Sequence, residues 1–301
     1  MIQDCPVDLP HGITLHCRVS GIPGRPVLLF LHGFPEGAFI WDELLLYFAR
    51  PENGGYRCVA PYLRGFGPSS SPQAVDAYRA KHLVQDLVAL IAHECPGSAL
   101  ECLIAHDWGG AVAWNLANQQ PQLVKRLAII NSPHPGAFLR ELQHSPAQQD
   151  ASQYMHFLCR PDAEALLSAN GYQRLFGFFD TPAGQPPAWL TDAVRAQYRD
   201  LWAQGLTGAC NYYRASPLRP PREGDRAALD LELPASMLSV DVPTLVLWGM
   251  DDPALLPGLL QGLPDWVHRL RLRQIEHASH WVVHEHPERV AQELGHFLLL
   301  K

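Results

Sequence analysis

The segment Leu103–Gly110 has the residue types and spacing of a site for nucleophilic chemistry. An apolar run leads into the order small-x-Asp-x-Gly, with Asp107 at the centre, and a helical run follows. This order is typical of a nucleophile elbow, in which small residues allow a tight turn to project one side chain above a sheet. A carboxylate that attacks an sp3 carbon forms an alkyl ester that water can cleave, whereas attack on a carboxylic ester would give an anhydride. Asp107 is therefore the candidate nucleophile, and the alternative is an aspartate that caps a helix.

An acid and a base follow Asp107 along the chain. The apolar run 244–248 ends in Gly-x-x-Asp, which indicates Asp252 as the acid that orients a catalytic histidine, with Asp251 as the alternative. His280 is the candidate general base. Three neighbouring histidines are expected to be solvated surface residues: His277, His284 and His286. The chain order nucleophile, acid, base is that of α/β-hydrolases and differs from the orders in chymotrypsin and subtilisin.

A third segment, His32–Glu36, follows the apolar run 27–31 directly and reads HGFPE. In a fold with a nucleophile elbow, this region supplies one backbone N–H of an oxyanion hole, and the residue after the nucleophile supplies the other. We therefore expect the N–H groups of Phe34 and Trp108 to form this hole. Pro35 is expected to fix the loop, with a cis bond as one option. Taken alone, HGFP also suits an ordinary turn.

These residues need a sheet to bring them together. Short apolar runs predict strands at 13–19, 27–31, 56–60, 100–105, 127–130 and 244–248. Continuous apolar runs are typical of parallel strands that are buried on both faces. The segment 78–93 has apolar residues at helical spacing, and strands that alternate with helices indicate an α/β fold with a mostly parallel sheet flanked by helices.

The alternation stops near 132–136 and resumes near 239–243. Helical stretches at 161–168 and 191–204 lie between these points, and they are interrupted by Pro and Gly. We interpret this segment as a helical insertion on the sheet. The sequence therefore predicts a core domain made of 1–133 and 239–301, and a helical cap domain at 134–238.

Charge and composition exclude several classes of function. The 301 residues carry a net charge of −7 and contain no basic block, so neither nucleic acid nor an anionic membrane surface is an expected partner. No apolar run reaches the ~18 residues that a membrane span needs. The seven scattered cysteines include no Cys-x-x-Cys pair, and with no signal peptide in view they predict a cytoplasmic protein. The sequence His284-Glu285-His286 lacks further ligands at zinc spacing, so no metal site is predicted.

The chain resembles α/β-hydrolases of the epoxide hydrolase and haloalkane dehalogenase group over essentially its whole length. Four segments carry the likeness, which is greatest to soluble epoxide hydrolases: HGFPE at 32–36, APYLRGFGPSS at 60–70, AHDWGG at 105–110 and ASHWVVHE at 278–285. In that group, two cap tyrosines hydrogen-bond the epoxide oxygen and protonate it as the ring opens. The resemblance maps the first to Tyr154 and the second, in Asn-Tyr-Tyr-Arg, to Tyr213.

The resemblance implies a cofactor-independent epoxide hydrolase that acts on a small apolar epoxide with water. Trp108, His156 and Phe157 are expected to bind substrate. A haloalkane or haloacid dehalogenase with the same nucleophile is the alternative. Haloacid chemistry is disfavoured because Trp108 and Ala111 stand where such enzymes place arginine, whereas Trp108 suits a leaving halide. A non-catalytic ligand-binding protein with the same fold is a further alternative. A homodimeric assembly is also possible for either function.

Overall fold

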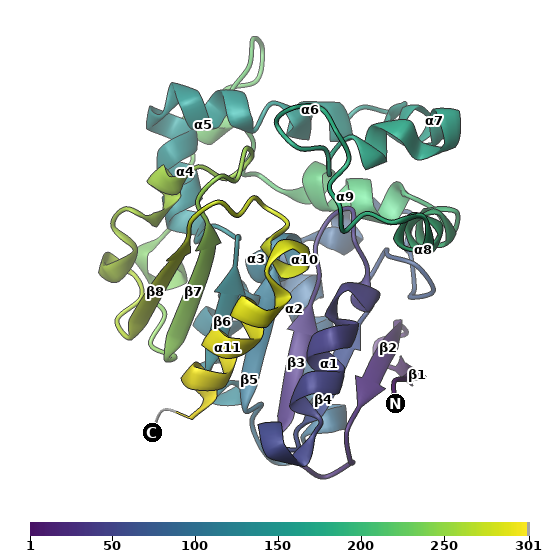
Figure 1. Cartoon of the computed structure of the whole chain (residues 1–301). Helices are drawn as coiled ribbons and strands as arrows, with labels where there is room; N and C mark the ends of the chain where they lie inside the picture. The colour runs from purple at the N-terminus through teal and green to yellow at the C-terminus, as the bar shows by residue number, and fades with distance from the viewer. Residues whose placement is uncertain (300–301) are drawn as a thin grey trace.

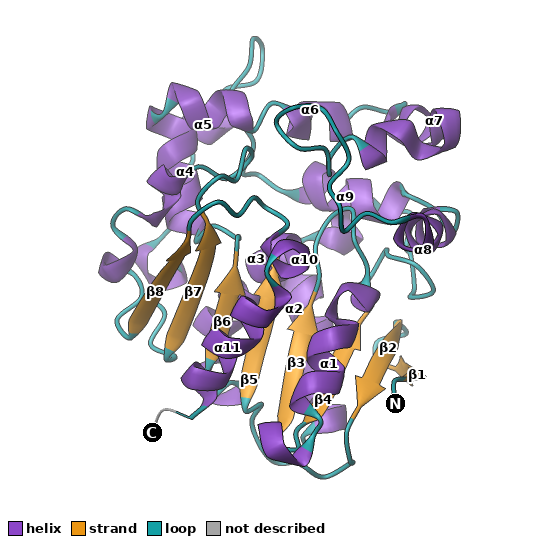
Figure 2. Cartoon of the chain, viewed as in Figure 1, coloured by secondary structure: helices purple, strands orange, loops and turns teal. Residues whose placement is uncertain are grey.

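An eight-stranded, mostly parallel sheet forms the centre of the computed structural model, which describes residues 1–299 (Figures 1 and 2). Its strand order is β1-β2-β4-β3-β5-β6-β7-β8, and only the pairs β1–β2 and β2–β4 are antiparallel. The strands are β1 (Gln3–Asp8), β2 (Thr14–Ser20), β3 (Val27–Leu31), β4 (Arg57–Pro61), β5 (Cys102–His106), β6 (Leu127–Ile130), β7 (Thr244–Gly249) and β8 (Leu270–Ile275).

Helices cover both faces of this sheet. In Figure 1, α1 (Asp42–Phe48) and α11 (Pro287–Leu298) lie in front of the strands, and α2 (Ala80–Glu94) and α3 (Asp107–Gln119) lie behind them. Successive side chains of β3 enter different apolar clusters: Phe30 packs in the cluster that contains α1 and α11, and Leu29 in the cluster that contains α2 and α3. This two-sided burial explains why β3 is apolar at every position.

A second group of helices lies beyond the carboxyl ends of the parallel strands (Figure 1). All of its members fall between β6 and β7, within the segment 134–238. They are α4 (Pro135–His144), α5 (Pro146–Ala151), α6 (Tyr154–Leu158), α7 (Ala163–Phe176), α8 (Asp192–Trp202) and α9 (Thr207–Ala215), and the short helix α10 (Val282–Glu285) follows β8. We refer to α4–α9 as the helical layer.

The observed elements match the expected α/β architecture. Every strand predicted from an apolar run is present, and α2 lies within one or two residues of its predicted range. Two strands were not predicted, β1 and β8. The stretch predicted at 161–168 is part of a longer helix, α7, which is interrupted by left-handed residues at 170–172. The last two residues of the predicted core domain lie outside the described residues.

Within residues 1–299, no helix is both long enough and apolar enough to cross a bilayer.

Candidate active site

The turn between β5 and α3 holds Asp107 in a backbone conformation that side chains rarely adopt. Its φ is +49°, in the left-handed region, so the side chain projects from the carboxyl end of β5. Two glycines that follow Asp107 permit this turn, because a Cβ on Gly109 would overlap the His32 carbonyl oxygen and a Cβ on Gly110 would overlap Ser132. Ser132 also donates from its hydroxyl to the Asp107 carbonyl at 2.7 Å. The small residues of the motif are therefore required by close approach.

The structure brings Asp107, His280 and Asp252 together. Nδ1 of His280 lies 2.7 Å from Asp252 Oδ2, and Nε2 lies 3.7 Å from Asp107 Oδ2. Asp252 is buried, and its carboxylate also accepts from the side-chain amide of Asn131 at 2.8 Å and from the N–H of Leu255 at 2.9 Å. Asp251, the alternative acid, has an exposed side chain. The imidazole thus bridges the two predicted carboxylates.

Burial and charge act in opposite directions on this histidine. Burial alone would lower the pKa of His280, but the charge of Asp252 and its hydrogen bond, together with the charge of Asp107, raise the pKa to about 9. For Asp252, burial would raise the pKa, and the charge and hydrogen bond of His280 outweigh it and lower the pKa. The resting site therefore favours an imidazolium between two carboxylates.

The HGFP loop reaches the nucleophile from β3. The N–H of Phe34 donates to Asp107 Oδ1 at 2.7 Å, and the Phe34–Pro35 peptide bond is cis. Trp108 lies in the first turn of α3, where free N–H groups favour negative charge. One oxygen of the Asp107 carboxylate is thus held by a backbone donor, and the other faces His280.

Two tyrosines of the helical layer lie above this carboxylate. The ring centres of Tyr154 on α6 and Tyr213 on α9 are 6.0 Å apart, and Tyr213 packs edge-on against Trp108 with ring centres 5.1 Å apart. Burial raises the pKa of both phenols, and the charge of Asp107 raises them further. Both hydroxyls therefore remain protonated donors at neutral pH.

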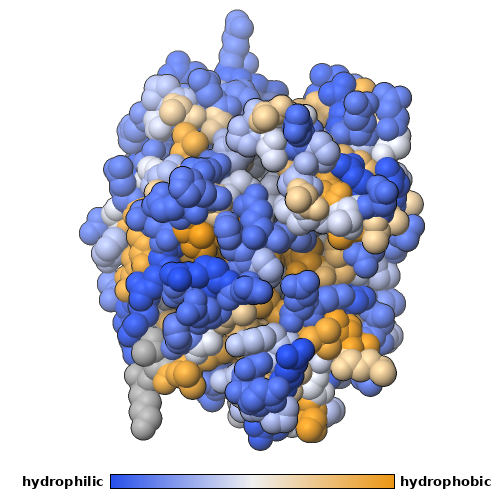
Figure 3. Space-filling model, in the orientation of Figure 1, coloured by the Kyte–Doolittle hydropathy of each residue, from blue (hydrophilic) through white to orange (hydrophobic). Residues whose placement is uncertain are grey.

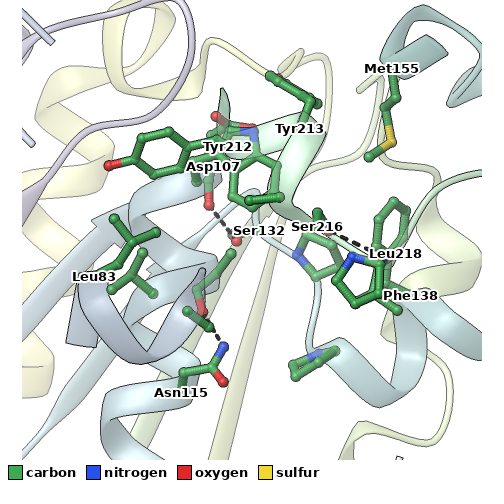
Figure 4. A pocket seen from close by; sticks show the side chains of 18 of the residues that line it. Leu83, Asp107, Asn115, Ser132, Phe138, Met155, Tyr212, Tyr213, Ser216 and Leu218 are labelled. Carbon is green, nitrogen blue, oxygen red and sulfur yellow. Dashed lines mark hydrogen bonds between the residues drawn. The ribbon is translucent and has the colours of Figure 1, made fainter. Parts of the chain in front are cut away.

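An apolar cavity of about 240 Å³ surrounds these groups. Figure 4 shows Leu83 and Asn115 on one side of Asp107, and Phe138 on the other. Further lining residues come from α3, α6 and the segments after α9: Trp108, Ala111, Met155, Leu218, Leu233 and Met237.

Two residues expected to bind substrate, His156 and Phe157, do not line this cavity. Helix α6 directs Tyr154 and Met155 toward the cavity, and since each residue turns a helix by about 100°, the next two face elsewhere. His156 contacts the backbone near Pro220, and the ring of Phe157 lies 5.6 Å from the Arg174 guanidinium.

A buried carboxylate to which the sequence motifs assign no role lies beside the site. Glu36 is fully buried, and its Oε1 accepts from Tyr198 at 2.7 Å and from His284 Nε2 at 2.6 Å. Its Oε2 lies 3.3 Å from His106 Nδ1, and His106 Nε2 lies 3.0 Å from the carbonyl oxygen of His280. The expectation that His284 is a solvated surface residue is therefore wrong.

The position of Glu36 offered one signal in the sequence. An ionisable residue that follows a strand buried on both faces enters the interior side of the loop, where a carboxylate needs partners. The partners themselves, His106, Tyr198 and His284, stand 70, 162 and 248 residues away, so the sequence could not identify them.

The described residues 1–299 contain no cluster of three or more His, Cys, Asp or Glu side chains arranged to hold a metal ion.

Comparison with known proteins extends these observations. The family model described as the alpha/beta hydrolase fold matches residues 26–287. The chain is 34% identical to the AB hydrolase superfamily protein YfhM of Bacillus subtilis, over 96% of this chain and 95% of that one. It is 33% identical to epoxide hydrolase 3 of Xenopus tropicalis, over 95% of this chain and 75% of that protein.

Solved structures are similar over the whole chain. The epoxide hydrolase of Bacillus megaterium, in complex with an inhibitor, superposes with a TM-score of 0.88 at 27% identity and covers 98% of this chain and 99% of its own. A structure described among novel epoxide hydrolases from metagenomes of hot environments superposes with a TM-score of 0.84 at 32% identity, over 100% of both chains.

Proposed function

The chain belongs to the α/β-hydrolase family, and from its site we propose that it is an epoxide hydrolase that converts a small apolar epoxide and water to a vicinal diol. One observation carries the proposal. A carboxylate at a nucleophile elbow faces an Asp–His pair on one side, and two protonated tyrosines lie above it. This set supplies a nucleophile for carbon, a proton donor for the leaving oxygen and a base for water.

In the first step, Oδ2 of Asp107 attacks an epoxide carbon and the C–O bond of the ring breaks. The opening oxygen gains negative charge, which hydrogen bonds from Tyr154 and Tyr213 stabilise, and one hydroxyl transfers its proton. Since Oδ1 is already held by the N–H of Phe34 at 2.7 Å, Oδ2 is the oxygen free to form the ester.

Esterification removes the Asp107 charge, which is one of the causes that raise the pKa of His280, so the imidazolium gives up its proton and the tyrosinate left by the first step is reprotonated. In the second step, the neutral imidazole of His280 takes a proton from water, which attacks Cγ of the ester. Asp252 orients the imidazole through Nδ1. The developing oxyanion is Oδ1, so the N–H of Phe34 is in place before the charge forms, and the N–H of Trp108 is the second donor. Collapse of the intermediate releases the diol and restores Asp107.

Within this proposal, Asp107, Asp252, His280, Tyr154 and Tyr213 are the catalytic residues, and 134–238 acts as a cap domain. No cofactor, nucleic acid or membrane takes part. The cysteines in the described residues are free, which supports a cytoplasmic location. A homodimer is an assembly that light scattering can test.

Haloalkane dehalogenation is the second candidate, because the indole of Trp108 lines the cavity next to Asp107 and would suit a leaving halide. Two tryptophans of the segment 134–238 offer it little support. The indole N–H of Trp202 donates to the Pro35 carbonyl at 2.6 Å, and Trp189 stacks on His284 at 4.1 Å. Haloacid chemistry has still less support, because the cavity presents Trp108 and Ala111 in place of arginine.

Intact-mass spectrometry of a His280→Gln variant tests the proposal. Without the base, the ester should accumulate, so styrene oxide should add its whole mass to the peptide that contains Asp107. If an adduct forms with a bromoalkane and not with styrene oxide, and bromide is released, the result would support dehalogenation instead. The double variant His280→Gln/Asp107→Ala is the control and should form no adduct. No adduct with either compound in the single variant would favour the non-catalytic alternative.

A further inference from the structure

The wall of the cavity around Asp107 offers a substrate no unpaired positive charge. Among residues 1–299, its wall contains no lysine, arginine or histidine, and Asp107 is its one carboxylate. The lysine and arginine side chains that adjoin wall residues along the chain are not part of the wall: Arg79, Lys81, Arg214 and Arg219. Arg214 pairs with Glu164 at 2.6 Å, and Arg79 pairs with Asp76 at 2.8 Å. The imidazolium of His280 is not part of the wall and is shared by Asp252 at 2.7 Å and Asp107 at 3.7 Å, so these three side chains keep a net charge of −1. An anionic substituent inside the cavity would therefore meet this negative charge and find no unpaired cation in the wall.

Several polar groups of the wall already have backbone partners. The hydroxyls of Tyr78, Ser132 and Tyr212 donate to the carbonyls of Pro72, Asp107 and Arg64. The side-chain amide of Asn115 donates to the Ala111 carbonyl at 2.8 Å, which leaves its oxygen, an acceptor, for a ligand. These groups cannot replace the water that a carboxylate loses on entry, and burial of such a charge without a partner is costly.

The cavity is also small. Its volume of about 240 Å³ is below the roughly 300–1,000 Å³ of common ligand sites, so a ligand has little room to retain hydrating water. The exterior of the helical layer is mainly hydrophilic (Figure 3), in contrast to the wall beneath it. Met237, about half exposed, lies at the wall and links it to the surface.

We propose that the site selects uncharged epoxides and rejects epoxides that carry a carboxylate close to the ring. This inference rests on the proposed function and deepens it, since it concerns the charge of the substrate and not the reaction. The selection arises from the lack of a cation in the wall, and a lysine placed at the rim should weaken it.

The experiment compares methyl 4-(oxiran-2-yl)benzoate with 4-(oxiran-2-yl)benzoate at pH 7. The two share the reacting ring and the aromatic frame and differ in charge. We expect kcat/KM for the ester to exceed that for the acid by at least about 30-fold, because the buried carboxylate lacks a partner. Similar values for both compounds would overturn the inference and leave epoxide hydrolysis standing.

Variants at two positions test whether the lack of a cation in the wall causes the selection. Met237→Lys should reduce the ester-to-acid ratio several-fold, and Met237→Glu should increase it. Ile22→Lys makes the same change in net charge at an exposed position outside the wall, and it should leave the ratio unchanged. An equal change in both lysine variants would assign the effect to overall charge and overturn the inference. If neither compound is hydrolysed and His280→Gln traps no styrene oxide, the proposed function fails and the inference fails with it.

Discussion

Replacement of Asp252 by asparagine tests the relation between the acid and the base. In the parent protein, the charge and hydrogen bond of Asp252 are the main causes that raise the pKa of His280 to about 9 against the effect of burial. The rise from the usual 6.5 corresponds to roughly 3 kcal/mol in favour of the imidazolium. Asp252→Asn removes this charge, so we expect the pKa of His280 to fall below about 7, toward the value set by burial.

The same substitution should block the second step and spare the first. Asp252 Oδ1 already accepts from the Leu255 N–H at 2.9 Å, and Oδ2 accepts from the Asn131 amide at 2.8 Å. An asparagine that keeps its oxygen toward Leu255 points its NH2 group at His280 Nδ1. The imidazole then carries its proton on Nε2, where it cannot accept one from water. We expect turnover to fall by about 10³-fold or more, as for the analogous change in a serine protease.

Three measurements check this reasoning: NMR titration of the His280 imidazole, steady-state turnover of styrene oxide, and intact mass during turnover. The expected result is a lowered pKa, lost turnover and an accumulated ester on Asp107. The matched control is Asp251→Asn, because this neighbouring carboxylate is exposed and 3.9 Å from the solvated His277. Turnover within tenfold of the parent, with an unchanged titration of His280, would refute the assignment of Asp252.

Further predictions concern stability and the helical layer. Because the pKa of His280 is raised, its contribution to the free energy of unfolding is complete below pH 6.5 and is lost as the pH rises through about 9. In urea unfolding, the parent should therefore lose roughly 3 kcal/mol more than His280→Gln over this pH range. Tyr154→Phe and Tyr213→Phe should each slow ester formation by at least about 100-fold in single-turnover assays, and unchanged rates in the double variant would exclude both as donors. Glu36→Gln should reduce the free energy of unfolding by about 3–5 kcal/mol, because it leaves buried partners unmatched, whereas Asp251→Asn should change it by under about 0.5 kcal/mol.

The sequence predicted the inner strands of the sheet and missed strands at its edges. β3, β5, β6 and β7 are buried at every residue, so their apolar runs are continuous. β1 and β8 each pair with a single neighbour and are largely exposed, and β8 carries Arg271 and Arg273 among its apolar residues. An edge strand needs only one partner and tolerates charge, so its pattern resembles that of a loop.

The sequence also predicted one part of the site better than the other. Asp107, Asp252 and His280 each follow a strand that ends at the same edge of the sheet, so their chain order and local motifs were enough to predict that they meet. The substrate side was harder, because it depends on which face of a short helix points inward. Helix α6 directs Tyr154 toward the cavity and turns His156 away from it. No periodicity in five residues could indicate that choice.

The loop that positions the nucleophile is held from the side of the helical layer as well as from the sheet. Helix α8 makes two buried hydrogen bonds to it, from Tyr198 to Glu36 at 2.7 Å and from Trp202 to the Pro35 carbonyl at 2.6 Å. The next residue back along this loop, Phe34, donates to Asp107. Since an unmade buried hydrogen bond is costly, the loop and α8 stabilise each other's position. The position of the Phe34 N–H, which would donate to the oxyanion, thus depends on residues more than 160 positions away in the chain. The whole fold sets this position, and the HGFP motif alone does not.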